Sequence, residues 1–226
     1  MLQILFEATY DTLRMVFIAS IFTILIGMPL GLLLEATQNN NILGNKYLWA
    51  HKLLLAFINF FSNVPIFLIL IMLIPIINKG LFAHFTIELS AVIAMVFIGI
   101  FIFANDVFNT LNNLPKELSD TAKFLGAEPM QVLTKFLLPE AMQNLVQNIT
   151  KLIINLLGLS IISSALGVHG LGQLALEKSY TDLELSYVFC IILLSAAIIY
   201  TIKLLGKYIA NNIQNKPEQQ TSMSTS

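Results

Sequence analysis

The sequence predicts an all-α integral membrane protein with five membrane-spanning helices. Of its 226 residues, 57% are hydrophobic and only 11% are charged, whereas about a quarter of the residues in a soluble globular domain are charged. Five apolar stretches reach the roughly 20 residues that a helix needs to cross the hydrocarbon core of a bilayer. These stretches lie at about 12–34, 53–77, 87–110, 142–166 and 185–206.

The five spans are expected to form one domain. We predict a transmembrane domain over residues 1–208, followed at 209–226 by a polar, disordered cytoplasmic tail. Positively charged loops are retained in the cytoplasm. An N-terminus on the outer side places nine of the twelve lysine and arginine residues at or near the inner side. The sequence therefore predicts a multi-pass protein in contact with membrane lipid, with its N-terminus outside and its C-terminus cytoplasmic.

Several function classes have no support in the sequence. The net charge of −1 gives no reason to expect nucleic acid as a partner. The chain has no Gly-x-x-x-x-Gly-Lys-Ser/Thr loop to hold ATP phosphates, and it lacks the His-Glu-x-x-His and Gly-x-Ser-x-Gly motifs of common hydrolases. Cys190 is the single cysteine, and His169 has no evident second ligand. We therefore predict no catalytic residue and no metal site.

A polar segment, KELSDTAKFLGAEPMQVLTKFLLPEA (116–141), separates the third and fourth spans. Helical spacing of apolar residues runs as far as Gly126, which can take the left-handed conformation that ends a helix. Glu128 and Pro129 are typical of a second helix start, and Pro139 is expected to end or kink that helix. Its predicted apolar face contains Met130, Leu133, Phe136 and Leu137. Such a helix either docks into a groove of a cytoplasmic partner or packs on its own bundle.

The order of residues in this segment resembles the EAA loop of ABC importer permeases. The loop has an acidic residue, small residues, a Gly-Ala pair and a terminal Leu-Pro at this spacing. The matching positions here are Asp120-Thr121-Ala122, Gly126-Ala127 and Leu138-Pro139. The chain departs from the usual loop in having Asp120 in place of Glu and Thr121 in place of Ala.

The resemblance extends over most of residues 10–208. Segments 58–77, 126–141 and 164–175 are similar to the methionine (D/L-methionine) import permeases, which belong to the type I, binding-protein-dependent superfamily. Two positions differ from those permeases. His169 stands where Gly is usual, and Ser62 stands where a basic residue is usual.

The resemblance implies a function and a set of partners. It implies a permease subunit, in the bacterial inner membrane, of an ATP-driven importer for a small amino acid, methionine above all. The permease would pair with itself, receive solute from an extracytoplasmic binding (lipo)protein, and be driven by two ATPase subunits. ATP and Mg would be used by those subunits, with no cofactor on this chain. The residues implied to couple to the ATPase are Asp120, Ala122, Gly126, Ala127, Glu128, Pro129, Met130 and Leu133.

Polar residues inside the spans are candidates for lining a solute pathway. They are costly in hydrocarbon and usually face the protein interior. The candidates are Asn63, Asp106, Asn155 and Ser160. Hydrogen bonds between helices explain such residues equally well, and Asp106 could instead sit at the membrane interface.

Glycines cluster after the fourth span. Gly167, Gly170 and Gly172 suggest a tight, irregular turn, which would be either an outer gate or an ordinary loop. Gly27 and Gly31 in the first span match the small-xxx-small spacing that lets two helices approach closely.

Two other functions remain open from the residues alone. A permease of this kind could carry another amino acid or a quaternary amine. A stand-alone secondary transporter or channel would need no ATPase, but it should show inverted repeats and intramembrane charge pairs. The sequence offers no convincing repeat and one candidate acid, Asp106.

Overall fold

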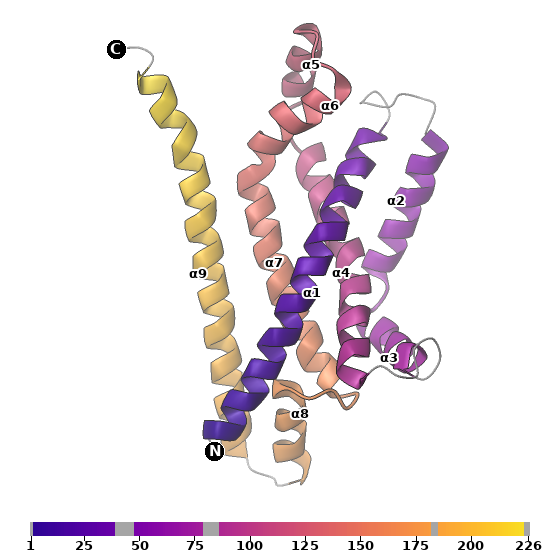
Figure 1. Ribbon diagram of the computed structural model, residues 1–226, viewed down its shortest axis with the longest axis vertical. Helices are drawn as coiled ribbons and strands as arrows, with labels where there is room; N and C mark the ends of the chain where they lie inside the picture. The colour runs from indigo at the N-terminus through magenta and orange to yellow at the C-terminus, as the bar shows by residue number, and fades with distance from the viewer. Residues whose placement is uncertain (1, 39–47, 79–85, 182–184, 224–226) are drawn as a thin grey trace.

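The computed structural model describes residues 2–38, 48–78, 86–181 and 185–223. Within these residues every regular element is helical, and the long helices run side by side (Figure 1). The long elements are α1 (Leu2–Ala36), α4 (Ile87–Asn112), α7 (Leu138–Ser164) and α9 (Leu185–Met223). The shorter elements are α2 (Leu48–Asn63), α3 (Ile66–Ile76), α5 (Lys116–Phe124), α6 (Pro129–Gln131), α8 (Leu171–Leu176) and the π-helical η3 (Val132–Leu137) and η4 (Glu177–Thr181).

Helix α4 is central, because α1, α2, α3 and α7 all pack against it. The contact with α1 is made where Gly27 and Gly31 face α4. A Cβ atom added to Gly31 would lie 2.7 Å from the carbonyl oxygen of Ala104 and 2.7 Å from the Cβ of Val107. The predicted close approach at these glycines is therefore confirmed. It lets Met95, Ile98 and other large apolar side chains of α4 become fully buried.

The second predicted span, 53–77, is not one helix. It is divided into α2 and α3, which meet at an angle of 97° at Val64 and Pro65. Proline has no N–H to donate and disfavours helical backbone in the residue before it, so the helix stops at Asn63. Before the bend, α2 packs on α4 through the stacked rings of Phe61 and Phe101, whose centroids lie 4.8 Å apart.

The fold class predicted from the sequence is confirmed. Four described helices are long and apolar enough to cross a membrane, and the bent α2–α3 pair makes a fifth if it is one span. Helix α9 shows the membrane environment most directly. It exposes large apolar side chains along most of its length, including Phe189, Ile192 and Leu204. Lipid covers such a surface at no cost, whereas water does not.

Helix boundaries differ from those expected. Helix α1 begins at Leu2 rather than near 12, and the helical stretch that contains α7 begins near residue 129 rather than 142. Helix α9 continues to Met223, so it includes most of the predicted tail, whose last three residues lie outside the described part. Extending an existing helix costs less than starting one, so polar flanks can join an apolar span.

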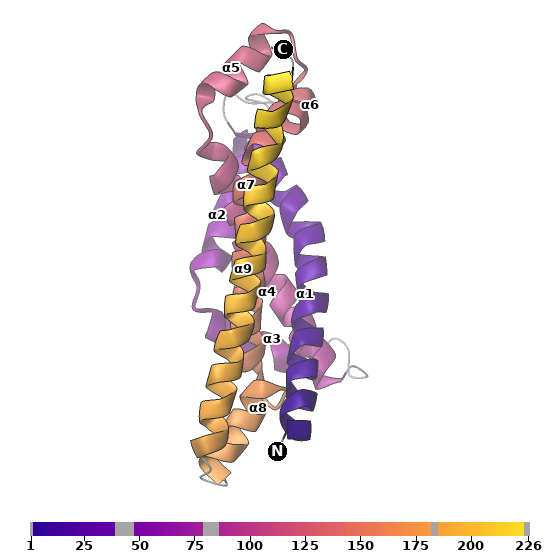
Figure 2. The ribbon, with the colours of Figure 1, turned by 90° about the vertical axis from the view of Figure 1, so that its left-hand side faces the viewer.

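The two ends of the molecule carry different short elements. Helices α5 and α6 lie at the end where α9 finishes, whereas α8 lies at the end where α1 begins (Figures 1 and 2). The polar segment 116–141 and the glycine-rich segment 165–172 are therefore at opposite ends of the bundle, joined by α7.

We predict that Gly31→Val destabilises the protein. The added side chain must push against backbone of α4, and overpacking of this kind costs about 1–3 kcal/mol. The measurement is the thermal unfolding midpoint of the purified protein in detergent. Ala196→Val, which adds bulk on the exposed face of α9, is the matched control and should leave the midpoint unchanged. Equal midpoints for both variants would contradict the proposed role of the α1–α4 contact.

Candidate functional site

The first part of the site is the corner that joins α5 to α6. Gly126 adopts the left-handed conformation with φ of +77°, as the sequence predicts. The N–H of Ala127 donates to the carbonyl of Ala122 over 3.0 Å, a bond that closes a Schellman-type helix end. A Cβ on Gly126 would meet nothing within 4 Å. The glycine is therefore required by backbone conformation rather than by space.

The second helix starts at Pro129, again as predicted. Glu128 precedes it, and its N–H donates to the side-chain oxygen of Gln131 over 3.3 Å. The N–H of Val132 donates to the carbonyl of Glu128 over 3.0 Å. These contacts resemble one half of a capping box. They fix the direction in which the chain leaves the corner.

Of the two expectations for Pro139, that it ends the helix or kinks it, the first is wrong, because the helix continues through it. Helix α6 passes through the π-helical η3 directly into α7, and Pro139 occupies the first turn of α7. A proline is tolerated in a first turn because the N–H it lacks is not needed there. The corner is thus joined to a membrane span by continuous helical backbone.

The corner has a buried side and an exposed side. Ala122, Val132, Leu133 and Leu137 belong to the main hydrophobic core. On the outside, Phe124 is 94% exposed, Leu125 73% and Met130 64%. We call these three residues the corner surface. They form an apolar patch beside the exposed carboxylates of Asp120 and Glu128.

The predicted apolar face of the second helix is therefore divided. Met130 points outward while Leu133 and Leu137 are buried, because the π-helical turn between them breaks the 3.6-residue spacing that the prediction assumed. Sequence reasoning missed Phe124 and did not expect Leu125 to be exposed. The available signal was that two large apolar residues stand directly before the glycine in an otherwise polar stretch.

The second part of the site is a row of polar side chains along α7. Asn144, Gln147, Lys151 and Asn155 are all exposed and follow one another at helical spacing. We call them the polar row. It extends for about 16 Å along the helix, roughly half of the hydrocarbon thickness. Gly158, the next residue on this face, has nothing within 4 Å of where a Cβ would lie, so the face stays open.

A buried amide positions the row relative to α4. Asn148 donates from Nδ2 to the carbonyl of Asp106 over 3.1 Å and to Oγ1 of Thr110 over 2.7 Å. Asn148 lies on the edge of the face that carries the row, so its two bonds to α4 hold the exposed row beside that helix. Asp106 itself is half-buried on α4, whereas Lys151 of the row is exposed on α7.

The four predicted pathway residues do not form one cluster. Asn155 belongs to the polar row, and Asp106 lies near Lys151 of that row. Ser160 is 0% exposed and faces another side of α7. Asn63 is exposed at the end of α2, where its Nδ2 donates to the carbonyl of Asn59 over 2.7 Å. The prediction missed Asn144 and Gln147, although their 3-4-4 spacing with Lys151 and Asn155 was visible in the sequence.

The third part of the site is the turn after α7, at the opposite end from the corner. Gly167 and Gly170 have φ of +89° and +151°, which confirms the predicted tight turn. Oγ1 of Thr12 accepts a 3.0 Å bond from the N–H of Leu171, tying the turn to α1. Gly172 is not in the turn but in α8, where a Cβ would collide with the carbonyl of Ile161. A gate at these glycines stays a prediction.

Comparisons with known proteins agree with this geometry. A family model described as the binding-protein-dependent transport system inner membrane component matches residues 27–215. The chain is 37% identical over 170 residues to the probable D-methionine transport system permease protein MetI of Pasteurella multocida. That alignment covers 75% of this chain and 76% of the relative. It is 34% identical over 161 residues to the D-methionine transport system permease protein MetI of Escherichia coli K12, with 71% and 72% covered.

Solved structures show the same likeness. The chain superimposes on a structure of the inward-facing MetNI methionine ABC transporter with a TM-score of 0.86 at 29% identity, over 94% of this chain and 97% of the other. An amino acid ABC transporter with histidines shares the fold, with a TM-score of 0.71 at 16% identity over 95% and 94% of the two chains. The match over most of the chain confirms the family resemblance, and this protein is a member of the binding-protein-dependent transport system inner membrane components.

Proposed function

We propose that this chain is the permease subunit of an ATP-driven importer whose solute is methionine. The observation that carries the proposal is the corner at Gly126. It presents an exposed apolar surface at one end of the bundle, and it is continuous with a span that carries a polar row. The single transmembrane domain over residues 1–208 would have its N-terminus on the outer side.

The corner surface is proposed to dock on a separate ATPase subunit. Phe124, Leu125 and Met130 are large apolar side chains that water surrounds in the isolated chain, and a cleft in a partner would bury them. The chain has no phosphate-binding loop of its own, so the energy of ATP must enter through such a contact. Nucleotide binding would favour one of two conformations of the assembly, and α7 would carry the movement to the membrane.

The polar row is proposed to line the pathway between two copies of the permease. Four polar side chains on a spanning helix are unfavourable against lipid, and α4, α1 and α9 already cover the other sides of α7. A second copy facing this row would enclose a water-filled path. Asn155 and Lys151 would then face the solute, with Asp106 on the adjacent α4.

The opposite end is proposed to receive solute from a binding protein. The turn at Gly167 and Gly170 lies there, beside the start of α1, and could act as an outer gate. Methionine is taken as the solute because MetI and MetNI are described by that solute. Another amino acid or a quaternary amine would leave the geometry of the corner and the row unchanged.

A stand-alone secondary transporter is the alternative that one observation favours. Asp106 on α4 and Lys151 on the adjacent α7 are an acid and a base within neighbouring helices, and such transporters use intramembrane groups of this kind. Liposomes that contain the chain alone, or the chain with its ATPase and binding protein, separate the two functions. Uptake of methionine only in the complete system with ATP supports the importer, and uptake by the chain alone refutes it.

In the complete system, Gly126→Val is expected to uncouple ATP hydrolysis from uptake. A β-branched residue at φ of +77° is strained by about 1–2 kcal/mol, so the corner changes shape although no neighbour is displaced. Methionine uptake per ATP hydrolysed should fall several-fold. Gly126→Asn is the matched control, because asparagine tolerates the left-handed conformation. If Gly126→Val transports as the wild type does, the corner does not couple the two reactions.

Loss of the corner surface is expected to weaken the ATPase complex. Burial of a side chain such as Phe124 or Met130 contributes about 1.5–3 kcal/mol, so Phe124→Ser and Met130→Ser should each weaken association by tenfold or more. The measurement is the amount of ATPase that co-purifies with the tagged permease. Leu176→Ser, which removes an exposed apolar side chain at the other end, is the control. Undiminished co-purification of both corner variants would contradict the docking role.

The polar row is expected to be accessible to water in the assembled transporter. A cysteine introduced by Asn155→Cys, in a Cys190→Ala background, should react readily with a water-soluble thiol reagent. Ile192→Cys, on the lipid-facing side of α9, should react at least tenfold more slowly, because thiolate does not form in hydrocarbon. Labelling is measured by mass spectrometry of the intact chain. Equally slow labelling at both positions would show that the row faces protein or lipid.

A further inference from the structure

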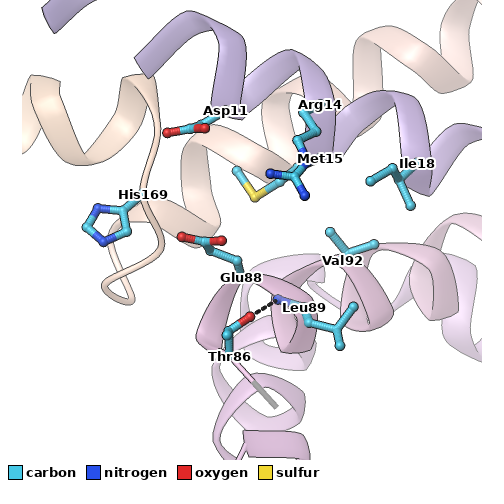
Figure 3. Close-up of a pocket in the computed structure, with 9 residues that line it drawn as sticks. All are labelled: Asp11, Arg14, Met15, Ile18, Thr86, Glu88, Leu89, Val92 and His169. Atoms are coloured by element: carbon cyan, nitrogen blue, oxygen red, sulfur yellow. Dashed lines mark hydrogen bonds between the residues drawn. The ribbon is translucent and has the colours of Figure 1, made fainter. Parts of the chain in front are cut away.

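A second polar site lies at the end of the bundle where α1 begins, in a cavity of about 220 Å³ (Figure 3). Three elements enclose it: α1, the start of α4 and the turn that contains His169. Its charged groups are Asp11, Arg14 and Glu88, and the His169 imidazole also lines it. Its apolar wall is formed by Met15, Ile18, Leu89 and Val92. We call it the outer cavity.

The walls of the outer cavity are held by hydrogen bonds from backbone N–H groups to threonine side chains. Thr86 begins α4, and its Oγ1 accepts a 3.3 Å bond from the N–H of Leu89 (Figure 3). On the opposite side, the turn behind His169 is held on α1 by the bond from Leu171 to Thr12. A Cβ on Gly170 would lie 2.8 Å from Oγ1 of Thr12, so the turn sits directly against α1. The cavity does not depend on its own charged groups for its shape.

Arg14 and Glu88 extend into the space between α1 and α4, whereas the His169 ring points away from both (Figure 3). Figure 3 shows Arg14 extending from α1 toward α4 and Glu88 extending from α4 toward α1. Within the described residues, no ion pair or side-chain hydrogen bond is formed by Asp11, Arg14, Glu88 or His169. Asp11 and Glu88 are half-buried, so their charges are partly removed from water. Unpaired charges in such a place favour a ligand that brings the opposite charges.

The arrangement of charge and apolar surface matches one class of small molecule. Arg14 supplies the guanidinium that binds a carboxylate with two parallel bonds. Asp11 and Glu88 supply carboxylates for an ammonium group. Met15 and Val92, both nearly fully buried, offer an apolar wall beside these charges. The volume is below the roughly 300–1,000 Å³ of sites for drug-sized ligands, so the occupant is small.

We propose that the outer cavity binds a zwitterionic α-amino acid with an apolar side chain. Its carboxylate lies on Arg14, its ammonium group on Asp11 and Glu88, and its side chain on the wall of Met15, Ile18 and Val92. A divalent cation is disfavoured by the Arg14 charge, and a phosphate is disfavoured by the two carboxylates. The choice of methionine as the probe rests on the proposed function, whereas the charge pattern of the cavity does not.

The position of the cavity gives the site a role distinct from that of the polar row. It lies at the end opposite the corner, beside the Gly167–Gly170 turn (Figures 1 and 3). An amino acid held there contacts α1, α4 and the turn at once. The site would retain solute at the outer face, before the polar row is reached.

The first test measures binding of radiolabelled L-methionine to the permease–ATPase complex in lipid nanodiscs, without binding protein. Saturable binding is expected. Arg14→Gln and Glu88→Gln should each weaken it by about tenfold or more, because each removes a hydrogen bond to a charged group. Lys203→Gln and Glu177→Gln, which lie outside the outer cavity, are the matched controls. Two methionine analogues, the amine that lacks the carboxylate and the acid that lacks the ammonium group, should compete poorly with methionine for the site.

The second test does not depend on charge variants that could misfold. In a Cys190→Ala background, Leu89→Cys places a thiol on the cavity wall, and L-methionine should slow its reaction with a membrane-impermeant maleimide. Absence of saturable methionine binding, binding indifferent to Arg14→Gln and Glu88→Gln, or no protection at residue 89 each overturns the site. ATP-driven uptake is measured in parallel. Uptake without cavity binding refutes only the site, whereas cavity binding without ATP-driven uptake refutes only the proposed function.

Discussion

The contact of α1 with α4 through Gly27 and Gly31 is the interaction on which the rest of the structure depends. Lipid gives helices no hydrophobic reason to associate, so close packing of backbone must supply the stabilisation. A side chain at Gly31 would meet the Ala104 carbonyl, which shows how near the two helices lie. With α1 in place, α4 can receive α2 and α3 on one side and α7 on another.

Helix α7 connects the three functional regions. Its beginning is continuous with the corner at Gly126, its middle carries the polar row, and its end leads into the turn at Gly170. Asn148 fixes its rotation relative to α4 by two hydrogen bonds. In the proposed mechanism, a displacement at the corner would reach the row through the continuous helical backbone of α6, η3 and α7. Coupling over such a distance requires rigid elements with discrete arrangements.

The two exposed surfaces have opposite chemistry, and each is unfavourable where it stands in the isolated chain. Apolar Phe124, Leu125 and Met130 extend into water, while the polar row lies within a membrane span. Under the proposed function, burial by a partner would remove the first mismatch, and a second permease copy around a water-filled path would remove the second. The charges of the outer cavity are a third unmatched set, and a small zwitterion rather than a protein would match them.

The sequence by itself determined the fold class, the corner and the family. Apolar length predicts spans because the bilayer fixes it, and Gly126 predicts the corner because left-handed backbone favours glycine. The sequence also contains the signal for the bend at Pro65, because proline interrupts a helix.

Only the tertiary structure decided which side chains face outward. Asn155 is exposed and Ser160 buried on the same helix, and Arg14 and Glu88, which are 74 residues apart in the sequence, line one cavity. The orientation of a side chain depends on which helices pack together, and the packing partners are distant in the sequence, so the local sequence does not determine it.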